Sequence, residues 1–144
     1  MAEPLGFVGL GNIGGPMAGT ILRKLKALTV FDVDPTRVRT LVEAGAEQAS
    51  SLRDLAARSR VILLSLPTSH EVEVVLLGDD GIGKAAARGT LIVDLTSGSP
   101  NGTELLVAAV LCDCGGWEDP SLQCEAGYQH AECARHGWLL SCLR

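Results

Sequence analysis

Lysine, cysteine and aromatic residues are few or unevenly spread in this sequence of 144 residues. Cysteine is absent before Cys112, and lysine is absent after Lys84. No basic run occurs and the net charge is -5, which argues against a nucleic-acid-binding protein. No apolar run is long enough to cross a bilayer, and strand-like residues begin at Leu5, so we expect neither a membrane segment nor a signal peptide. These absences favour a globular protein of the cytoplasm.

The composition changes sharply at about residue 110. All five cysteines, both tryptophans and the single tyrosine lie in residues 111–144, whereas the three lysines all precede residue 85. We therefore predict a folded domain over residues 1–110 and an irregular tail, rich in cysteine and tryptophan, over residues 111–144. The cysteine and histidine residues of the tail lack the paired spacing of zinc sites, so we predict no metal site.

Residues 5–110 alternate between strand-like and helix-like patterns. Short aliphatic and β-branched runs predict strands at 5–10, 27–32, 61–66 and 90–94, with a weaker one at 46–49. Capping residues predict helices that begin after Asp34, Ser51, Thr68 and Ser99. Such alternation predicts an α/β fold of Rossmann type, a doubly wound and mostly parallel sheet with helices on both faces.

A glycine-rich turn, Gly9-Leu10-Gly11-Asn12-Ile13-Gly14, follows the first predicted strand and opens a helix. In this context Gly9 permits a tight turn, Gly11 lets the backbone approach a pyrophosphate, and Gly14 allows close packing of helix on strand. The free N–H groups and the positive end of the helix dipole favour a diphosphate. The turn therefore predicts a dinucleotide site.

Asp32 lies at the end of the second predicted strand, 18 residues after Gly14. A carboxylate there accepts hydrogen bonds from the ribose hydroxyls of NAD and repels the 2′-phosphate of NADP. In a second interpretation, Asp32 only caps the turn that leads into the next helix. Arg37 and Arg39 are nearby cations that would weaken the discrimination, so NAD is favoured and NADP stays an open alternative.

Four segments together resemble the β-hydroxyacid dehydrogenase family, to which 3-hydroxyisobutyrate dehydrogenase belongs. Residues 7–18 resemble the family's opening signature, and residues 66–69 resemble the loop that lies along the cofactor. Residues 78–82 resemble a glycine-punctuated segment, and residues 94–100 resemble the substrate-binding segment. The resemblance covers residues 5 to about 105 and implies a small β-hydroxyacid or its semialdehyde as substrate.

The resemblance also assigns site residues. It implies a substrate site at Thr96, Ser97 and Gly98. It implies, together with the glycine turn and Asp32, a cofactor site made of Gly9, Leu10, Gly11, Asn12, Ile13, Gly14, Asp32, Leu66, Pro67 and Thr96.

The family's general acid/base is a lysine in a later helix, and this sequence has no lysine after Lys84. We therefore assign no catalytic residue. The family's helical second domain, which usually builds the dimer interface, is also absent from the sequence. Three hypotheses stay open: an NAD-dependent oxidoreductase, a non-catalytic binding fragment or truncated isoform, and another nicotinamide reductase of the same fold, similar to 6-phosphogluconate dehydrogenase.

Overall fold

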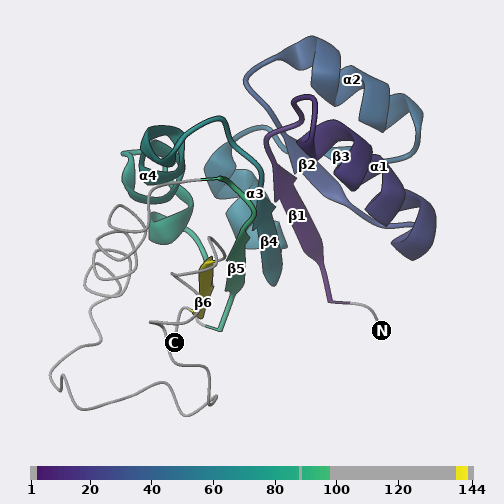
Figure 1. Cartoon of the computed structure of the whole chain (residues 1–144). Helices are drawn as coiled ribbons and strands as arrows, with labels where there is room; N and C mark the ends of the chain where they lie inside the picture. Colours follow the sequence, from purple (N-terminus) through teal and green to yellow (C-terminus); the bar gives the residue numbers. More distant parts are fainter. Residues whose placement is uncertain (1–2, 88, 98–138, 143–144) are drawn as a thin grey trace, which may run out of the picture.

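The computed structural model describes residues 3–87, 89–97 and 139–142 (Figure 1). They form one sheet with the strand order β3-β2-β1-β4-β5-β6. The first five strands are parallel, and this arrangement confirms the predicted Rossmann-type fold. The strands are β1 (Leu5–Val8), β2 (Thr29–Phe31), β3 (Glu47–Gln48), β4 (Val61–Leu64), β5 (Leu91–Asp94) and β6 (Leu139–Cys142).

Helices cover both faces of the sheet (Figure 1). One face carries α1 (Gly14–Leu25) and α2 (Pro35–Glu43), and the other carries α3 (Leu52–Arg58), α4 (Ser69–Leu77) and the short 3₁₀ helix η1 (Ile82–Lys84). Each layer has its own apolar core. Phe7 belongs to the core under α1 and α2, and its neighbour Val8 belongs to the core under α3 and α4, because successive strand side chains point to opposite faces. None of the described helices is long and apolar enough to cross a membrane.

Three of the four predicted helix starts are confirmed. The Asp34 carboxylate accepts a hydrogen bond from the Thr36 N–H at 2.9 Å, and Pro35 occupies the first position of α2. The Ser51 and Thr68 hydroxyls cap α3 and α4 in the same manner. The helix predicted after Ser99 lies outside the described residues.

Ser51 and Thr68 each have an acidic residue three positions further on, the spacing of a capping box, but the bonds of these carboxylates differ from the usual pattern. The Asp54 carboxylate accepts from the N–H of Ser50 rather than from that of Ser51, at 2.8 Å, and this bond holds the pKa of Asp54 below its ordinary value. The Glu71 carboxylate accepts from the Thr68 hydroxyl, which lowers the pKa of Glu71. Both carboxylates stabilise the first turn of their helices near its positive end.

The strands end earlier than the apolar runs predict. The runs at 5–10 and 61–66 continue past the true strand ends at Val8 and Leu64. Beyond those ends the backbone N–H groups of Leu10 and Leu66 bind side-chain oxygens rather than a neighbouring strand. Hydrophobicity alone does not reveal this change of partner.

A strand from the tail extends the sheet beyond β5. Residues 139–142 form β6, which pairs antiparallel with β5, so that Leu91 faces Cys142 and Asp94 faces Leu139. The sequence predicts only an irregular tail here. A pairing between segments more than 40 residues apart has no local signal in the sequence, and the strand is therefore a finding of the structure.

Candidate functional site

The glycine turn lies at the carboxyl end of β1, directly before α1. Gly9 has a φ of 91°, and a Cβ on it would lie 2.1 Å from the carbonyl oxygen of Ser65. A Cβ on Gly14 would lie 1.9 Å from the carbonyl oxygen of Gly9. Both positions therefore require glycine. Ile13, before the first turn of α1, supplies no side-chain cap, so the helix start presents backbone N–H groups at the turn.

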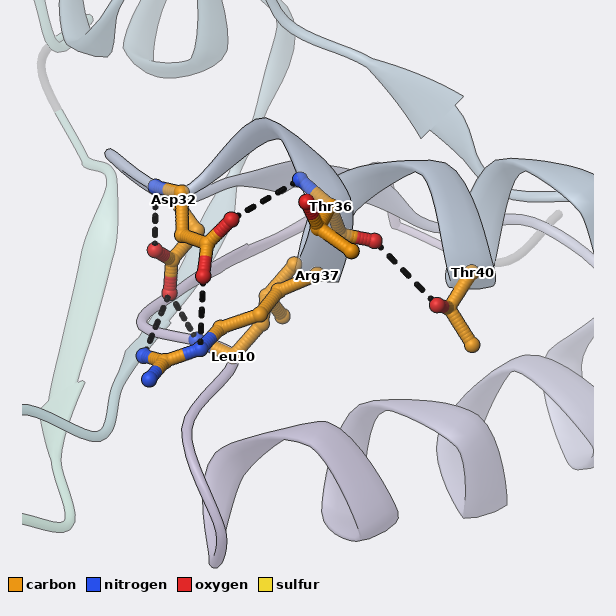
Figure 2. A network of polar contacts seen from close by, with 6 residues as sticks. Leu10, Asp32, Thr36, Arg37 and Thr40 are labelled. Carbon is orange, nitrogen blue, oxygen red and sulfur yellow. Dashed lines mark hydrogen bonds and ion pairs between the residues drawn. The ribbon is translucent and has the colours of Figure 1, made fainter.

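The Asp32 carboxylate joins the end of β2 to the glycine turn (Figure 2). One of its oxygens accepts from the Leu10 N–H at 2.6 Å, and the other accepts from the Asp34 N–H at 2.8 Å. The side chain is only 5% exposed. Asp32 thus caps its own turn, as the second interpretation proposed, and also reaches the glycine turn. Since each carboxylate oxygen accepts more than one hydrogen bond, this arrangement leaves capacity for ribose hydroxyls.

Arg37 and Arg39 have different partners in the structure, although both were predicted only as cations near Asp32. The Arg37 guanidinium extends from α2 over the glycine turn, with Nη1 3.9 Å from Asp32 Oδ2 and Nε 3.4 Å from Asp34 Oδ2 (Figure 2). Arg39 instead pairs with Glu43 at 3.9 Å on the outer surface of α2. Of these two cations, Arg37 alone lies beside Asp32.

A groove of about 920 Å³ begins at the glycine turn and continues between α1 and α2. Its lining includes the cations Arg23, Lys26 and Arg37 and contains no carboxylate. Asp32 and the segments after β4 and β5 do not line it. The groove therefore shares Leu10, Gly11 and Asn12 with the predicted cofactor residues, and the other predicted residues lie outside its lining.

The loops after β4 and β5 are bonded to each other. The Thr96 hydroxyl oxygen accepts from the Leu66 N–H at 3.1 Å, and the Thr96 N–H donates to Asp94 Oδ1 at 2.9 Å. Asp94 and Thr96 are 7% and 5% exposed, whereas Ser97 is exposed. Burial raises the pKa of the Asp94 carboxyl. Gly98, the third predicted substrate residue, lies outside the described residues.

The loop after β4 also contacts the glycine turn. A Cβ on Gly14 would lie 3.2 Å from Cβ of Ser65, and the Ser65 N–H donates to the Val8 carbonyl at 2.9 Å. The predicted residues from the three loops therefore meet at one edge of the sheet, between β1 and β4, where the strand order reverses. In open α/β sheets, ligands bind at this reversal.

The protein-family model for the NAD binding domain of 6-phosphogluconate dehydrogenase matches residues 4–111. The chain belongs to this family of NAD-binding domains. The match includes the glycine turn, Asp32 and the loops after β4 and β5, whose geometry fits a dinucleotide at the reversal point.

Curated relatives of the NAD-binding domain are β-hydroxyacid dehydrogenases. The 3-hydroxyisobutyrate dehydrogenase of Pseudomonas aeruginosa is 38% identical over 96 residues, which cover 67% of this chain and 32% of the relative. The NAD-dependent L-serine dehydrogenase of the same organism is 38% identical over 107 residues, covering 74% of this chain and 36% of the relative. The chain thus spans about a third of the length of these curated relatives.

A solved structure with the same fold is an imine reductase from Myxococcus stipitatus in complex with NADP⁺. It is 27% identical to this chain, with a TM-score of 0.67. The matched region covers 73% of this chain and 36% of the imine reductase chain. The chain is therefore similar to a protein solved with NADP⁺ as well as to an NAD-dependent dehydrogenase.

Sequence reasoning did not name Ser65, and it included Asp94 only within the segment 94–100. Asp94 repeats the pattern of Asp32, because each ends a strand and accepts from the N–H two residues further on. That Asp-x-x spacing was the available signal. The role of Ser65 depends on a contact with Gly9 and Gly14 across two strands, which no local pattern reveals.

Lys84 lies away from this site. Its Nζ is 3.3 Å from Asp79 Oδ1, and η1 comes after the end of α4 and before the amino end of β5. Within the described residues, Lys84 forms no hydrogen bond or ion pair with the glycine turn or with the loops after β4 and β5. Among the described residues, no group of three or more His, Cys, Asp or Glu side chains is arranged to hold a metal ion.

Proposed function

We propose that this chain binds NAD at the carboxyl edge of its sheet as the cofactor half of a β-hydroxyacid dehydrogenase. The observation that supports the proposal most directly is the pair of hydrogen bonds from Leu10 and Asp34 to the buried Asp32 carboxylate. These bonds hold a charged acceptor beside the glycine turn before any ligand arrives. A preorganised carboxylate binds ribose hydroxyls without a further ordering cost.

The pyrophosphate of the cofactor would lie against the N–H groups of Gly11, Asn12, Ile13 and Gly14. The positive end of α1 favours its charge there. Bound nicotinamide would accept or donate a hydride. Pro67, Thr96, Ser97 and Gly98 are proposed to bound the space for nicotinamide and a small β-hydroxyacid, the substrate class that the relatives' names indicate.

Proton transfer is not assigned to any residue of this chain. The reaction needs a group that takes the hydroxyl proton as the hydride leaves, and the family's lysine has no counterpart after Lys84. We therefore propose binding without turnover for these 144 residues. A cytoplasmic location and the absence of nucleic-acid partners stay predictions from composition.

Arg37 adds a tolerance for NADP to this proposal. The Asp32 carboxylate disfavours a 2′-phosphate, but the Arg37 guanidinium beside it is half exposed and can pair with that phosphate. We expect NAD to bind more tightly, with NADP as a weaker second ligand.

Calorimetric titration with NADH and NADPH tests the proposal. We expect Asp32→Ala to weaken NADH binding about tenfold or more, because it removes a charged acceptor. Arg37→Ala should weaken NADPH binding by a similar factor and leave NADH binding nearly unchanged. Arg39→Ala is the matched control and should change neither. Wild-type protein that binds neither nucleotide would overturn the proposal, as would Asp32→Ala with unchanged affinity.

Turnover is measured separately with NAD and 3-hydroxyisobutyrate. We expect no NADH production by the wild-type chain. Production that disappears in Asp32→Ala would contradict the non-catalytic part of the proposal while supporting cofactor binding.

A further inference from the structure

The hydroxyls of Thr96 and Ser97, which the sequence treats as equivalent, have different surroundings. Thr96 is 5% exposed and its oxygen accepts from the Leu66 N–H at 3.1 Å. Ser97 is exposed, and no hydrogen bond of its side chain occurs among the described residues. One acceptor site of the Thr96 hydroxyl is therefore used by the protein, whereas Ser97 is exposed.

The bond between Thr96 and Leu66 connects the two loops that carry the predicted cofactor and substrate residues. On the Leu66 side, the adjoining Ser65 lies against Gly9 and Gly14 of the glycine turn. On the Thr96 side, the Asp94 carboxylate holds the Thr96 N–H at 2.9 Å. Backbone bonds of the sheet flank this bond, since the Leu95 N–H donates to the Leu64 carbonyl at 2.8 Å.

The Leu66 N–H lies beyond the end of β4, outside the hydrogen bonds of the sheet, and donates to a side chain. Without the hydroxyl of Thr96 it would be a donor left unpaired in a partly buried loop, which is costly. The loop would then shift to expose that N–H to water. Such a shift would move Leu66 and Pro67 relative to the glycine turn.

We propose that Thr96 is a positioning residue, whose hydroxyl oxygen fixes the loop after β4 against the glycine turn. This positioning effect on a ligand passes through Leu66 and adds to any direct contact that Thr96 makes with the ligand. The effect on cofactor affinity rests on the proposed function, whereas the effect on the loop does not.

Amide hydrogen exchange and NADH titration of the full chain test this assignment. Thr96→Val keeps the shape of the side chain and removes the acceptor. We expect the Leu66 amide to exchange at least about tenfold faster, while the Phe7 amide in the centre of the sheet is unchanged. NADH affinity should fall about threefold to tenfold. Thr96→Ser restores the acceptor and should return both quantities to the wild-type values.

Thr90→Val provides a matched control. Thr90 is a second buried threonine, fully enclosed just before β5, and its hydroxyl has no partner among the described residues. The same substitution there should leave both Leu66 exchange and NADH affinity unchanged.

Unchanged Leu66 exchange in Thr96→Val would overturn the assignment, whatever the nucleotide does. Equal acceleration at Leu66 and Phe7 would also overturn it, because the residue would then stabilise the whole fold rather than one loop. If wild-type protein does not bind NADH, the proposed function fails, and Leu66 exchange still decides the role of Thr96.

Discussion

At the carboxyl ends of the strands, side-chain oxygens as well as backbone carbonyls hold the backbone N–H groups of neighbouring loops, whereas at the amino ends, within the described residues, the acceptors are backbone carbonyls. Asp32 holds the Leu10 N–H and Thr96 holds the Leu66 N–H at the carboxyl end. At the amino end, the Pro4 carbonyl accepts from the Arg60 N–H at 2.8 Å, and the Arg60 carbonyl accepts from the Leu91 N–H at 2.8 Å.

The buried hydroxyls of the amino end show the same contrast. The side-chain oxygens of Ser59 and Thr90 are buried and have no hydrogen-bond partner among the described residues. These two hydroxyls therefore add no hydrogen bond to the backbone contacts of the amino end within the described residues. The carboxyl end also uses particular side chains, which belong to the proposed dinucleotide site. If the proposed function holds, stability and binding are coupled at one end of the sheet and separate at the other.

The strongest test of this contrast is Gly9→Ala at the carboxyl end. Gly9 has a φ of 91°, and its new Cβ would lie 2.1 Å from the Ser65 carbonyl oxygen. Backbone strain and the clash together should lower the free energy of unfolding by about 3 kcal/mol or more. Urea denaturation measures the loss.

Gly45→Ala is the matched control for Gly9→Ala. Gly45 has a φ of 106°, but nothing lies within 4 Å of its Cβ position. It should lose only the strain contribution, about 1–2 kcal/mol. Equal losses at the two glycines would show that backbone strain alone matters and that the close approach of the Ser65 loop does not.

Much of the scaffold at the carboxyl end could be predicted because its signals are local. The glycine turn is contiguous, and the start of α2 after Asp34 depends on residues that adjoin in sequence. The chain's membership of the NAD-binding family agrees with the fold that those signals predicted.

The cross-links between loops could not be predicted, because they join distant residues. Thr96 and Leu66 are 30 residues apart, and no periodicity relates them. The pairing of β6 with β5 was not predicted, for the same reason. Strands were predicted to continue too far where the N–H of an apolar residue such as Leu10 donates to a side chain. Hydrophobicity indicates that a residue is buried and does not indicate which group its N–H binds.

A smaller effect is expected from Asp94→Asn, also at the carboxyl end. Burial raises the pKa of Asp94 above 3.8, so its contribution to stability is complete below that pH and is lost as the pH rises through the folded-state pKa. No ion pair to Asp94 occurs among the described residues that would offset this loss. Asparagine can keep the acceptor for the Thr96 N–H and removes the charge.

The free energy of unfolding of Asp94→Asn, relative to wild type, should therefore increase with pH. The increase begins near pH 4, and its slope stays below about 1.4 kcal/mol per pH unit, the limit for one proton. Urea denaturation between pH 3.5 and 7.5 measures it. A difference that is constant across this range would show that the Asp94 charge is well solvated in the folded chain.

The smallest effects are expected at the amino end, from Ser59→Ala and Thr90→Val. Each substitution removes a buried hydroxyl that lacks a partner among the described residues, so the desolvation cost of that hydroxyl disappears. Thermal and urea denaturation should show stability unchanged or raised by about 1 kcal/mol. A loss of 1 kcal/mol or more in both variants would mean that polar side chains also hold the amino end, and the contrast between the two ends would then be wrong.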